Sequence, residues 1–146
     1  MVGPMQKQLF RSVAPLLIAL AFAACQSTTS SSAKVENITP KEAYGELTNS
    51  FGVLVDVRES DELSETGLAD GAVWIPTSKI KEGASEWTDF LKKTPKEKKL
   101  MFYCAAGVRA GRAASDASGH GFKAYNVGGF RDWKSAGLPI KKWEQK

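Results

Sequence analysis

The chain has 146 residues, of which 42% are hydrophobic and 25% charged, with a formal net charge of +4. This composition is typical of a soluble globular domain, and this length supports one hydrophobic core but not two separate ones. The only basic cluster, residues 92–99, has no aromatic residues between its lysines, so it predicts a solvated loop. A nucleic-acid partner is therefore not expected.

The first 24 residues predict an export signal. Lys7 and Arg11 precede the apolar run 13–24, which is too short to span a bilayer but matches the hydrophobic part of a secretory signal. Removing residues 1–24 would leave 18 basic and 16 acidic residues. The mature chain is therefore nearly neutral, and we expect it outside the cytoplasm.

Cys25 follows the small residues that end this signal. The sequence FAAC (22–25) resembles a bacterial lipoprotein box, in which the cysteine becomes the lipid-modified N-terminus. The alternative is conventional cleavage after Ala23 or Ala24, which would leave Cys25 as a free thiol. Residues 25–34 are rich in serine and threonine and predict a flexible tether. We expect a periplasmic protein attached to the membrane through a lipid on Cys25, without assigning the inner or outer membrane.

Residues 35–143 predict one folded domain in which short apolar runs alternate with helical segments. Thr39, Pro40 and Glu42 have the spacing of a helix start, with a capping residue, a proline in the first turn and a glutamate that completes a capping box. In chain order we expect a strand at 35–38, a helix opening within 38–47, a strand at 52–57, a short helix at 59–65, a strand at 71–76, a helix at 84–93, a strand at 99–104, a helix at 110–119, a strand at 123–127 and a helix at 128–137.

This alternation predicts an α/β fold with a parallel sheet covered by helices on both faces. In such sheets ligands bind beyond the carboxyl ends of the strands. Cys104 ends one buried strand, and Asp56 and Arg58 end another. These three residues are therefore expected at the same edge of the sheet.

Cys104 lies between a strand and the alanine-rich helix that follows it. A cysteine in such a place is often only a small core residue. Here, however, the loop of small residues that follows can turn its backbone N–H groups toward the sulfur, and the N-terminus of the next helix favours a thiolate. Arg109 adds a positive charge at the rim. Arg112, one helical turn later, has two interpretations: it helps to attract an anionic substrate, or it is a solvent-facing helix residue. This arrangement suits a nucleophile for an anionic substrate.

Several stretches of the chain together resemble the rhodanese domain. They occur in the usual order and are DVRESDE (56–62), GAVWIP (71–76), YCAAGVRAGRAA (103–114), GF (121–122) and GGFRDWKSAGLP (128–139). The resemblance implies a rhodanese-like α/β fold with a central five-stranded parallel sheet. It also implies a sulfurtransferase that holds a sulfane sulfur as a cysteine persulfide. Among family members, the chain is most similar to the small periplasmic rhodaneses of the phage-shock type.

The resemblance also implies roles for individual residues. Cys104 would be the catalytic nucleophile, and Ala105, Ala106, Gly107, Val108 and Arg109 would bind the donor. Asp56 and Arg58 would support the neighbouring loops. Gly128, Gly129, Trp133, Gly137 and Pro139 would be scaffold residues. Trp74 and Trp87 are expected to lie in the hydrophobic core. The implied partners are a small anionic sulfur donor, such as thiosulfate, and a cyanide or thiol acceptor, with no cofactor and no metal.

Two departures from the family pattern bear on the donor. Many members have Gly-His-Ile where this chain has Gly67-Leu68-Ala69, and the only histidine, His120, lies in a predicted surface turn. Ala105 stands where many members have arginine or another polar residue. The loop is therefore less cationic than the loops of good thiosulfate users, which predicts weak thiosulfate activity or a different donor.

Other function classes fit the sequence less well. Related cysteine phosphatases need a longer loop than the four residues between Cys104 and Arg109. A disulfide oxidoreductase needs a resolving cysteine nearby, and a metal site needs more ligands than one thiol and one distant histidine. The non-enzyme alternative is a rhodanese-like binding or sulfur-carrier module with little turnover.

Overall fold

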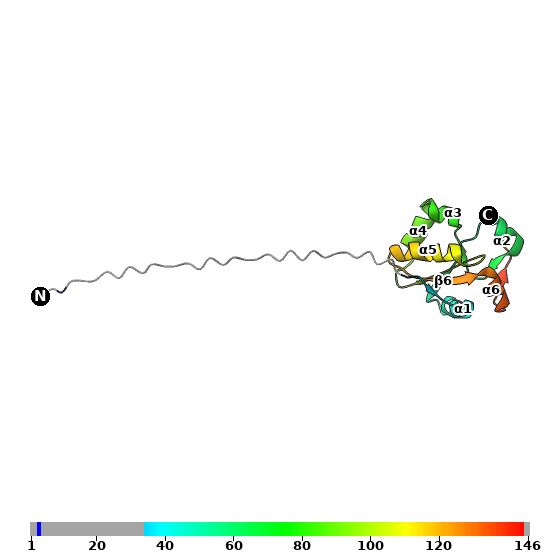
Figure 1. The fold of residues 1–146 in the computed structure, drawn as a ribbon, viewed down its shortest axis with the longest axis horizontal. Helices are drawn as coiled ribbons and strands as arrows, with labels where there is room; N and C mark the ends of the chain where they lie inside the picture. The colour runs from blue at the N-terminus through cyan, green and yellow to red at the C-terminus, as the bar shows by residue number, and fades with distance from the viewer. Residues whose placement is uncertain (1–2, 4–33, 145–146) are drawn as a thin grey trace. The chain divides into compact units, whose positions relative to one another are not determined.

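The structure is a computed structural model that describes residue 3 and residues 34–144 (Figure 1). The predicted signal at 1–24 apart from residue 3, Cys25, and the predicted tether apart from residue 34 lie outside the described residues. Within the described part of the chain, no helix is both long enough and apolar enough to cross a membrane.

The domain is built on a five-stranded parallel sheet, as the sequence predicts. Its strands lie in the order β1-β6-β5-β2-β4, so β5, the fourth of these strands along the chain, is central in space. Their bounds are β1 Glu36–Asn37, β2 Gly52–Asp56, β4 Val73–Trp74, β5 Lys99–Cys104 and β6 Lys123–Gly129. Every residue of β5 after Lys99 is buried, which explains its continuous apolar sequence.

Helices cover both faces of this sheet (Figure 1). On one face, Trp87, Phe102 and the alanines of α5 form a core cluster, and the small alanine side chains let that helix approach β5 closely. On the other face, Tyr103 and Trp133 pack in a second cluster with ring centroids 6.2 Å apart. The helices are α1 Pro40–Thr48, α2 Ser60–Thr66, α3 Thr77–Lys81, α4 Ser85–Lys93, α5 Val108–Gly119 and α6 Phe130–Ser135.

The predicted start of α1 is confirmed. The Glu42 backbone N–H donates to Thr39 Oγ1 at 3.3 Å, and the Thr39 N–H donates to Glu42 Oε2 at 2.9 Å. These reciprocal bonds satisfy two backbone donors that a helix N-terminus otherwise leaves without partners.

Several predicted boundaries shift, and three short elements are additional. The strand predicted at 71–76 pairs only at Val73–Trp74, and Gly128–Gly129 end β6 instead of opening the last helix. Helix α3 begins directly after Pro76, and β3 (Leu68–Ala69) pairs antiparallel with β7 (Ile140–Lys141). The additional elements α3, β3 and β7 contain too few residues to produce a hydrophobic period, so the sequence pattern does not reveal them.

One of the two tryptophans assigned to the core is placed differently. Trp87 is 2% exposed, as expected, but Trp74 is only half-buried. The Trp74 ring packs edge-on against Trp143 with centroids 5.2 Å apart, and its Nε1–H donates to the Arg58 carbonyl at 2.8 Å. Trp74 therefore joins the edge strand to the segment after β2 instead of filling the central core.

Candidate active site

The turn that follows β5 holds the sulfur of Cys104. This turn contains only Ala105, Ala106 and Gly107, because α5 already begins at Val108. Gly107 adopts a left-handed conformation (φ 91°), which suits glycine, and its backbone N–H donates to Cys104 Sγ at 3.0 Å. The Cys104 residue is only 2% exposed. The sulfur is thus fixed at the N-terminus of a twelve-residue helix.

The end of β6 forms the floor under this turn. Gly129 pairs with Cys104 in the sheet register, and a Cβ atom at Gly129 would lie 2.6 Å from the Ala105 carbonyl oxygen. A Cβ on Gly107 would lie 3.3 Å from the Cα of Gly128. The backbone of the turn therefore rests directly on two glycines, at distances that a side chain would not allow.

Replacing Gly129 by alanine is expected to displace the turn. The added methyl group meets a backbone oxygen, which can move only together with the turn, so we expect a loss of about 1–3 kcal/mol in the free energy of unfolding. Urea unfolding measures this change. Gly45→Ala is the matched control, because nothing lies within 4 Å of its Cβ position inside α1 and we expect it to be neutral or stabilising. Equal stability of G129A and the wild type would contradict the close contact.

Arg109 lies in the first turn of α5 and is held by Glu62 of α2. Its Nη1 and Nη2 donate to the two Glu62 carboxylate oxygens at 2.6 and 2.7 Å. These hydrogen bonds raise the pKa of Arg109. The hydrogen bonds from Arg109 likewise lower the pKa of Glu62. Glu62 ends the stretch DVRESDE (56–62), but no local pattern predicts its bond to Arg109, because that partner is 47 positions away.

Asp56 and Arg58 form a buried ion pair behind the turn. Arg58 Nη2 lies 2.6 Å from Asp56 Oδ2, and their side chains are 3% and 0% exposed. The Arg58 guanidinium also donates to Thr66 Oγ1 and to the Gly67 carbonyl, each at 2.8 Å, and its Cζ lies 4.0 Å from the centre of the Phe130 ring. The pair thus joins the end of β2 to the end of α2 and holds the segment between them.

The Tyr103 hydroxyl belongs to the same buried group. It accepts a hydrogen bond from the Ala69 backbone N–H at 3.0 Å. Burial raises the pKa of Tyr103, and the negative charge of Asp56 raises it further, so the phenol stays protonated at neutral pH. Tyr103 therefore contributes packing and a fixed hydrogen bond, not acid–base chemistry.

A small cavity opens beside the Cys104 turn. It has a volume of about 260 Å³, and its lining residues come from three parts of the chain: Arg58, Glu62, Glu65, Thr66, Ala105, Phe130 and Arg131. Ala105 lines this cavity, and Ala106 and Val108 are exposed in the same segment of the chain. Arg112, one turn along α5, is also exposed. His120 is exposed at the far end of α5 and does not reach the turn.

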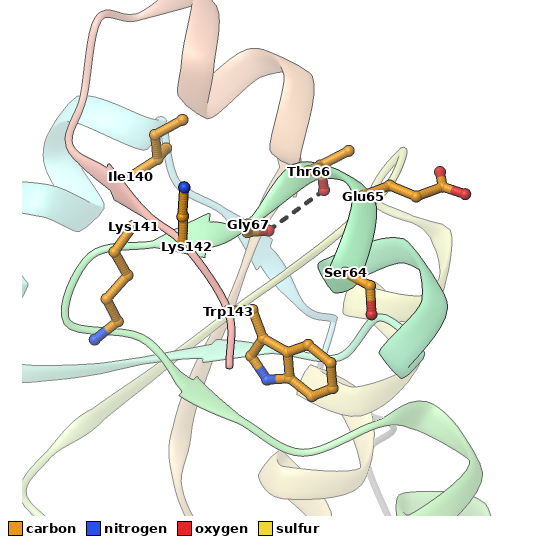
Figure 2. Close-up of a pocket in the computed structure, with 8 residues that line it drawn as sticks. All are labelled: Ser64, Glu65, Thr66, Gly67, Ile140, Lys141, Lys142 and Trp143. Carbon is orange, nitrogen blue, oxygen red and sulfur yellow. Dashed lines mark hydrogen bonds between the residues drawn. The ribbon is translucent and has the colours of Figure 1, made fainter. Parts of the chain in front are cut away.

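A second cavity, of about 510 Å³, lies between the end of α2 and the C-terminal segment 140–143 (Figure 2). Figure 2 shows Trp143 facing Ser64 across this cavity, with Lys141 at the end of β7 and Lys142 directly after it. The Gly67 carbonyl, which accepts from Thr66 here, is the same oxygen that accepts from Arg58. This cavity does not include the Cys104 turn.

Several sulfurtransferases and rhodanese-like proteins are similar to most of the folded domain. A mouse thiosulfate sulfurtransferase/rhodanese-like domain-containing protein 3 is 29% identical over 75% of this chain and 74% of its own. The thiosulfate sulfurtransferase GlpE of Coxiella burnetii is 32% identical over 57% of this chain and 72% of its own. Bacterial tRNA uridine(34) hydroxylases also match, but the chain spans only 26–27% of their length.

Solved structures have the same fold. A rhodanese-related protein of Thermoplasma volcanium superposes with a TM-score of 0.60 at 26% identity, over 74% of this chain and 99% of its own. A protein of unknown function from Rhodopseudomonas palustris, described as a possible tyrosine phosphatase, has a TM-score of 0.59 at 29% identity, over 73% and 85% of the two chains. The sequence profile of the rhodanese-like domain matches residues 39–136. The chain therefore belongs to the rhodanese-like domain family.

Proposed function

We propose that the protein is a sulfurtransferase that moves a sulfane sulfur from a donor to a nucleophilic acceptor through a persulfide on Cys104. One observation carries this proposal: Cys104 Sγ receives the Gly107 N–H at 3.0 Å, at the N-terminus of α5 and beside the positively charged Arg109. Both a thiolate and a persulfide anion are stabilised by such donors and charges. The sulfurtransferase names of the relatives support the same activity.

The first half of the reaction loads the cysteine. With thiosulfate as donor, the Cys104 thiolate attacks the outer sulfur, the S–S bond of the donor breaks, and sulfite leaves with the electron pair. The product is a Cys104 persulfide anion. Its outer sulfur lies about 2 Å beyond Sγ, and this is the atom that an acceptor attacks.

The second half unloads the cysteine. An incoming cyanide or thiolate attacks the outer sulfur, the persulfide bond breaks, and Cys104 returns as a thiolate. Thiocyanate or a new persulfide is released. No net oxidation of the protein occurs, so neither half requires a cofactor. The Gly107 N–H and the N-terminus of α5 provide the stabilisation at Sγ in both halves, whereas Asp56 and Arg58 hold the surrounding segments in place.

A thiocyanate assay tests this activity. Purified protein with thiosulfate and cyanide is expected to form thiocyanate, and the same protein is expected not to hydrolyse p-nitrophenyl phosphate. Phosphate release without thiocyanate would favour the phosphatase class, with which the Rhodopseudomonas palustris neighbour is associated. The short turn between Cys104 and the first turn of α5 suits one sulfur atom better than a tetrahedral phosphate.

The alternative is a rhodanese-like binding or sulfur-carrier module. The burial of Cys104, at 2% exposure, is the observation that favours it, because a donor must reach a nearly covered sulfur. A carrier would accept one sulfur from the donor and release it slowly. A single burst of one sulfite per protein, followed by no turnover with cyanide, would identify this alternative.

We further propose that the protein is exported, carries a lipid on Cys25 and acts in the periplasm, like the phage-shock-type rhodaneses. The apolar run 13–24 and the sequence FAAC (22–25) support this. Cells expressing the full chain and fed radiolabelled palmitate are expected to label the protein in the membrane fraction. Cys25→Ala is expected to abolish the label, and Cys104→Ala is the matched control that keeps it. Equal labelling of C25A would contradict the anchor.

A further inference from the structure

The positive charges nearest Cys104 are already compensated. Arg58 pairs with Asp56, and Arg109 pairs with Glu62 through both terminal nitrogens. The small cavity beside the turn is lined by two further charges of opposite sign, those of Glu65 and Arg131. A doubly negative donor would therefore meet no net positive charge at this mouth.

Glu62 is fixed in place and cannot easily release Arg109. Its Oε2 also accepts the Glu59 backbone N–H at 3.0 Å, which closes a capping box at the start of α2. Glu59 in turn accepts the Ser78 N–H and hydroxyl at 3.0 Å each, so this end of α2 is tied to α3. These bonds hold the Glu62 carboxylate in one position in the site, so it is not a mobile surface charge.

The rim of the turn is apolar. Ala105 and Ala106 are exposed, and Val108 is 67% exposed. Exposed apolar groups beside a nucleophile favour a substrate that has an organic part to place against them. Neither the charges nor the rim is arranged for a small inorganic dianion.

We infer that Glu62 selects the donor: by pairing with both terminal nitrogens of Arg109 and compensating its charge, it turns the site from thiosulfate toward organic sulfane donors with a single negative charge, such as thiosulfonates. This inference rests on the proposed sulfur transfer and specifies its substrate class. Coulomb repulsion by the fixed carboxylate acts twice as strongly on a dianion as on a monoanion at the same place. Glu62 is therefore a specificity residue that acts through Arg109.

The chemistry with a thiosulfonate has the same balance as with thiosulfate. The Cys104 thiolate attacks the terminal sulfur of R–SO₂–S⁻, the S–S bond breaks, and a sulfinate leaves with the electron pair. The Cys104 persulfide anion that forms is identical to the one formed from thiosulfate. The R group can lie against Ala105 and Val108 at the rim, where thiosulfate has only a charged oxygen.

The test compares Glu62→Gln with the wild type on two donors, thiosulfate and benzenethiosulfonate, with cyanide as acceptor. Glutamine keeps an oxygen for the Glu59 N–H but removes the negative charge, so the positive charge of Arg109 is no longer compensated. The KM for thiosulfate is expected to fall about five- to tenfold, and the KM for benzenethiosulfonate less than about threefold. The kcat values are expected to change little, because Cys104 and Gly107 are unaltered.

Asp61→Asn is the matched control. It removes one negative charge from the neighbouring, exposed position of the same helix turn, without a bond to Arg109. It is expected to leave the KM values for both donors within about twofold. Equal changes in E62Q and D61N, or an unchanged or higher KM for thiosulfate in E62Q, would overturn the role of Glu62.

A wild-type measurement covers the case in which E62Q does not fold. The KM for thiosulfate is expected to stay nearly constant as ionic strength rises, because salt has little net attraction to screen. A steep rise of KM with salt would show an uncompensated cation and overturn the inference. If neither donor forms a persulfide on Cys104, the proposed function itself fails, and that outcome is distinct from an unexpected donor preference.

Discussion

Replacing Cys104 by serine is expected to lower thiocyanate formation by about a thousandfold or more, because the persulfide then has no sulfur on which to form. The hydroxyl of serine is a far weaker nucleophile and cannot carry a sulfane sulfur. Its oxygen can still accept the Gly107 N–H, so the turn after β5 keeps its bond to residue 104. The variant should therefore lose thiocyanate formation but keep its fold.

The initial rate of thiocyanate formation, at saturating thiosulfate and cyanide, measures this loss. Thermal unfolding of both proteins checks that they share one fold. Arg112→Gln is a matched control on the exposed side of α5, and its kcat is expected to stay within about twofold of the wild type. A C104S variant that retained a tenth of the wild-type rate would show that another group carries the reaction.

Replacing Asp56 by alanine is expected to destabilise the fold by about 3–5 kcal/mol, since it leaves the buried Arg58 guanidinium without a counter-charge. The Asp56 carboxylate accepts the Arg58 backbone N–H at 3.0 Å as well as Nε and Nη2 of the side chain. The variant therefore breaks the bend after β2 together with the ion pair. The segment 66–67, which Arg58 holds, should loosen at the same time.

Urea unfolding of the wild type and the variant measures this change. Glu86→Ala is the comparison for a surface pair, because Glu86 and Lys79 are 56% and 43% exposed, and a change below about 0.5 kcal/mol is expected. The double variant Asp56→Leu, Arg58→Met is expected to be more stable than Asp56→Ala, since it removes both buried charges. A loss of less than about 1 kcal/mol in D56A would contradict the importance of the pair.

The sequence predicts the sheet and the cysteine turn because both leave local signals. Strand β5 is a continuous apolar run, and Gly107 marks the point at which the chain turns in a left-handed conformation before α5. The capping residues of α1 are likewise neighbours in the chain. In each case, the residues that determine the structure lie within a few positions of one another.

The partners of these residues are not local, and the sequence does not reveal them. Arg109 is expected from the family pattern to face a donor, but its bond to Glu62 depends on how α2 lies against α5. Trp74 is apolar enough for a core residue, yet its position on the short edge strand β4 leaves it half-buried. Such pairings depend on tertiary packing, which no short-range pattern encodes.

The most direct test of the account is the mass of the protein after treatment with a sulfane donor. Intact-protein and peptide mass spectrometry should find one added sulfur atom, located on the peptide that contains Cys104 and removed by cyanide. The peptide with Cys25, where present, should gain none. A Cys104 peptide without added sulfur, after both thiosulfate and benzenethiosulfonate, would contradict the persulfide at the centre of the account.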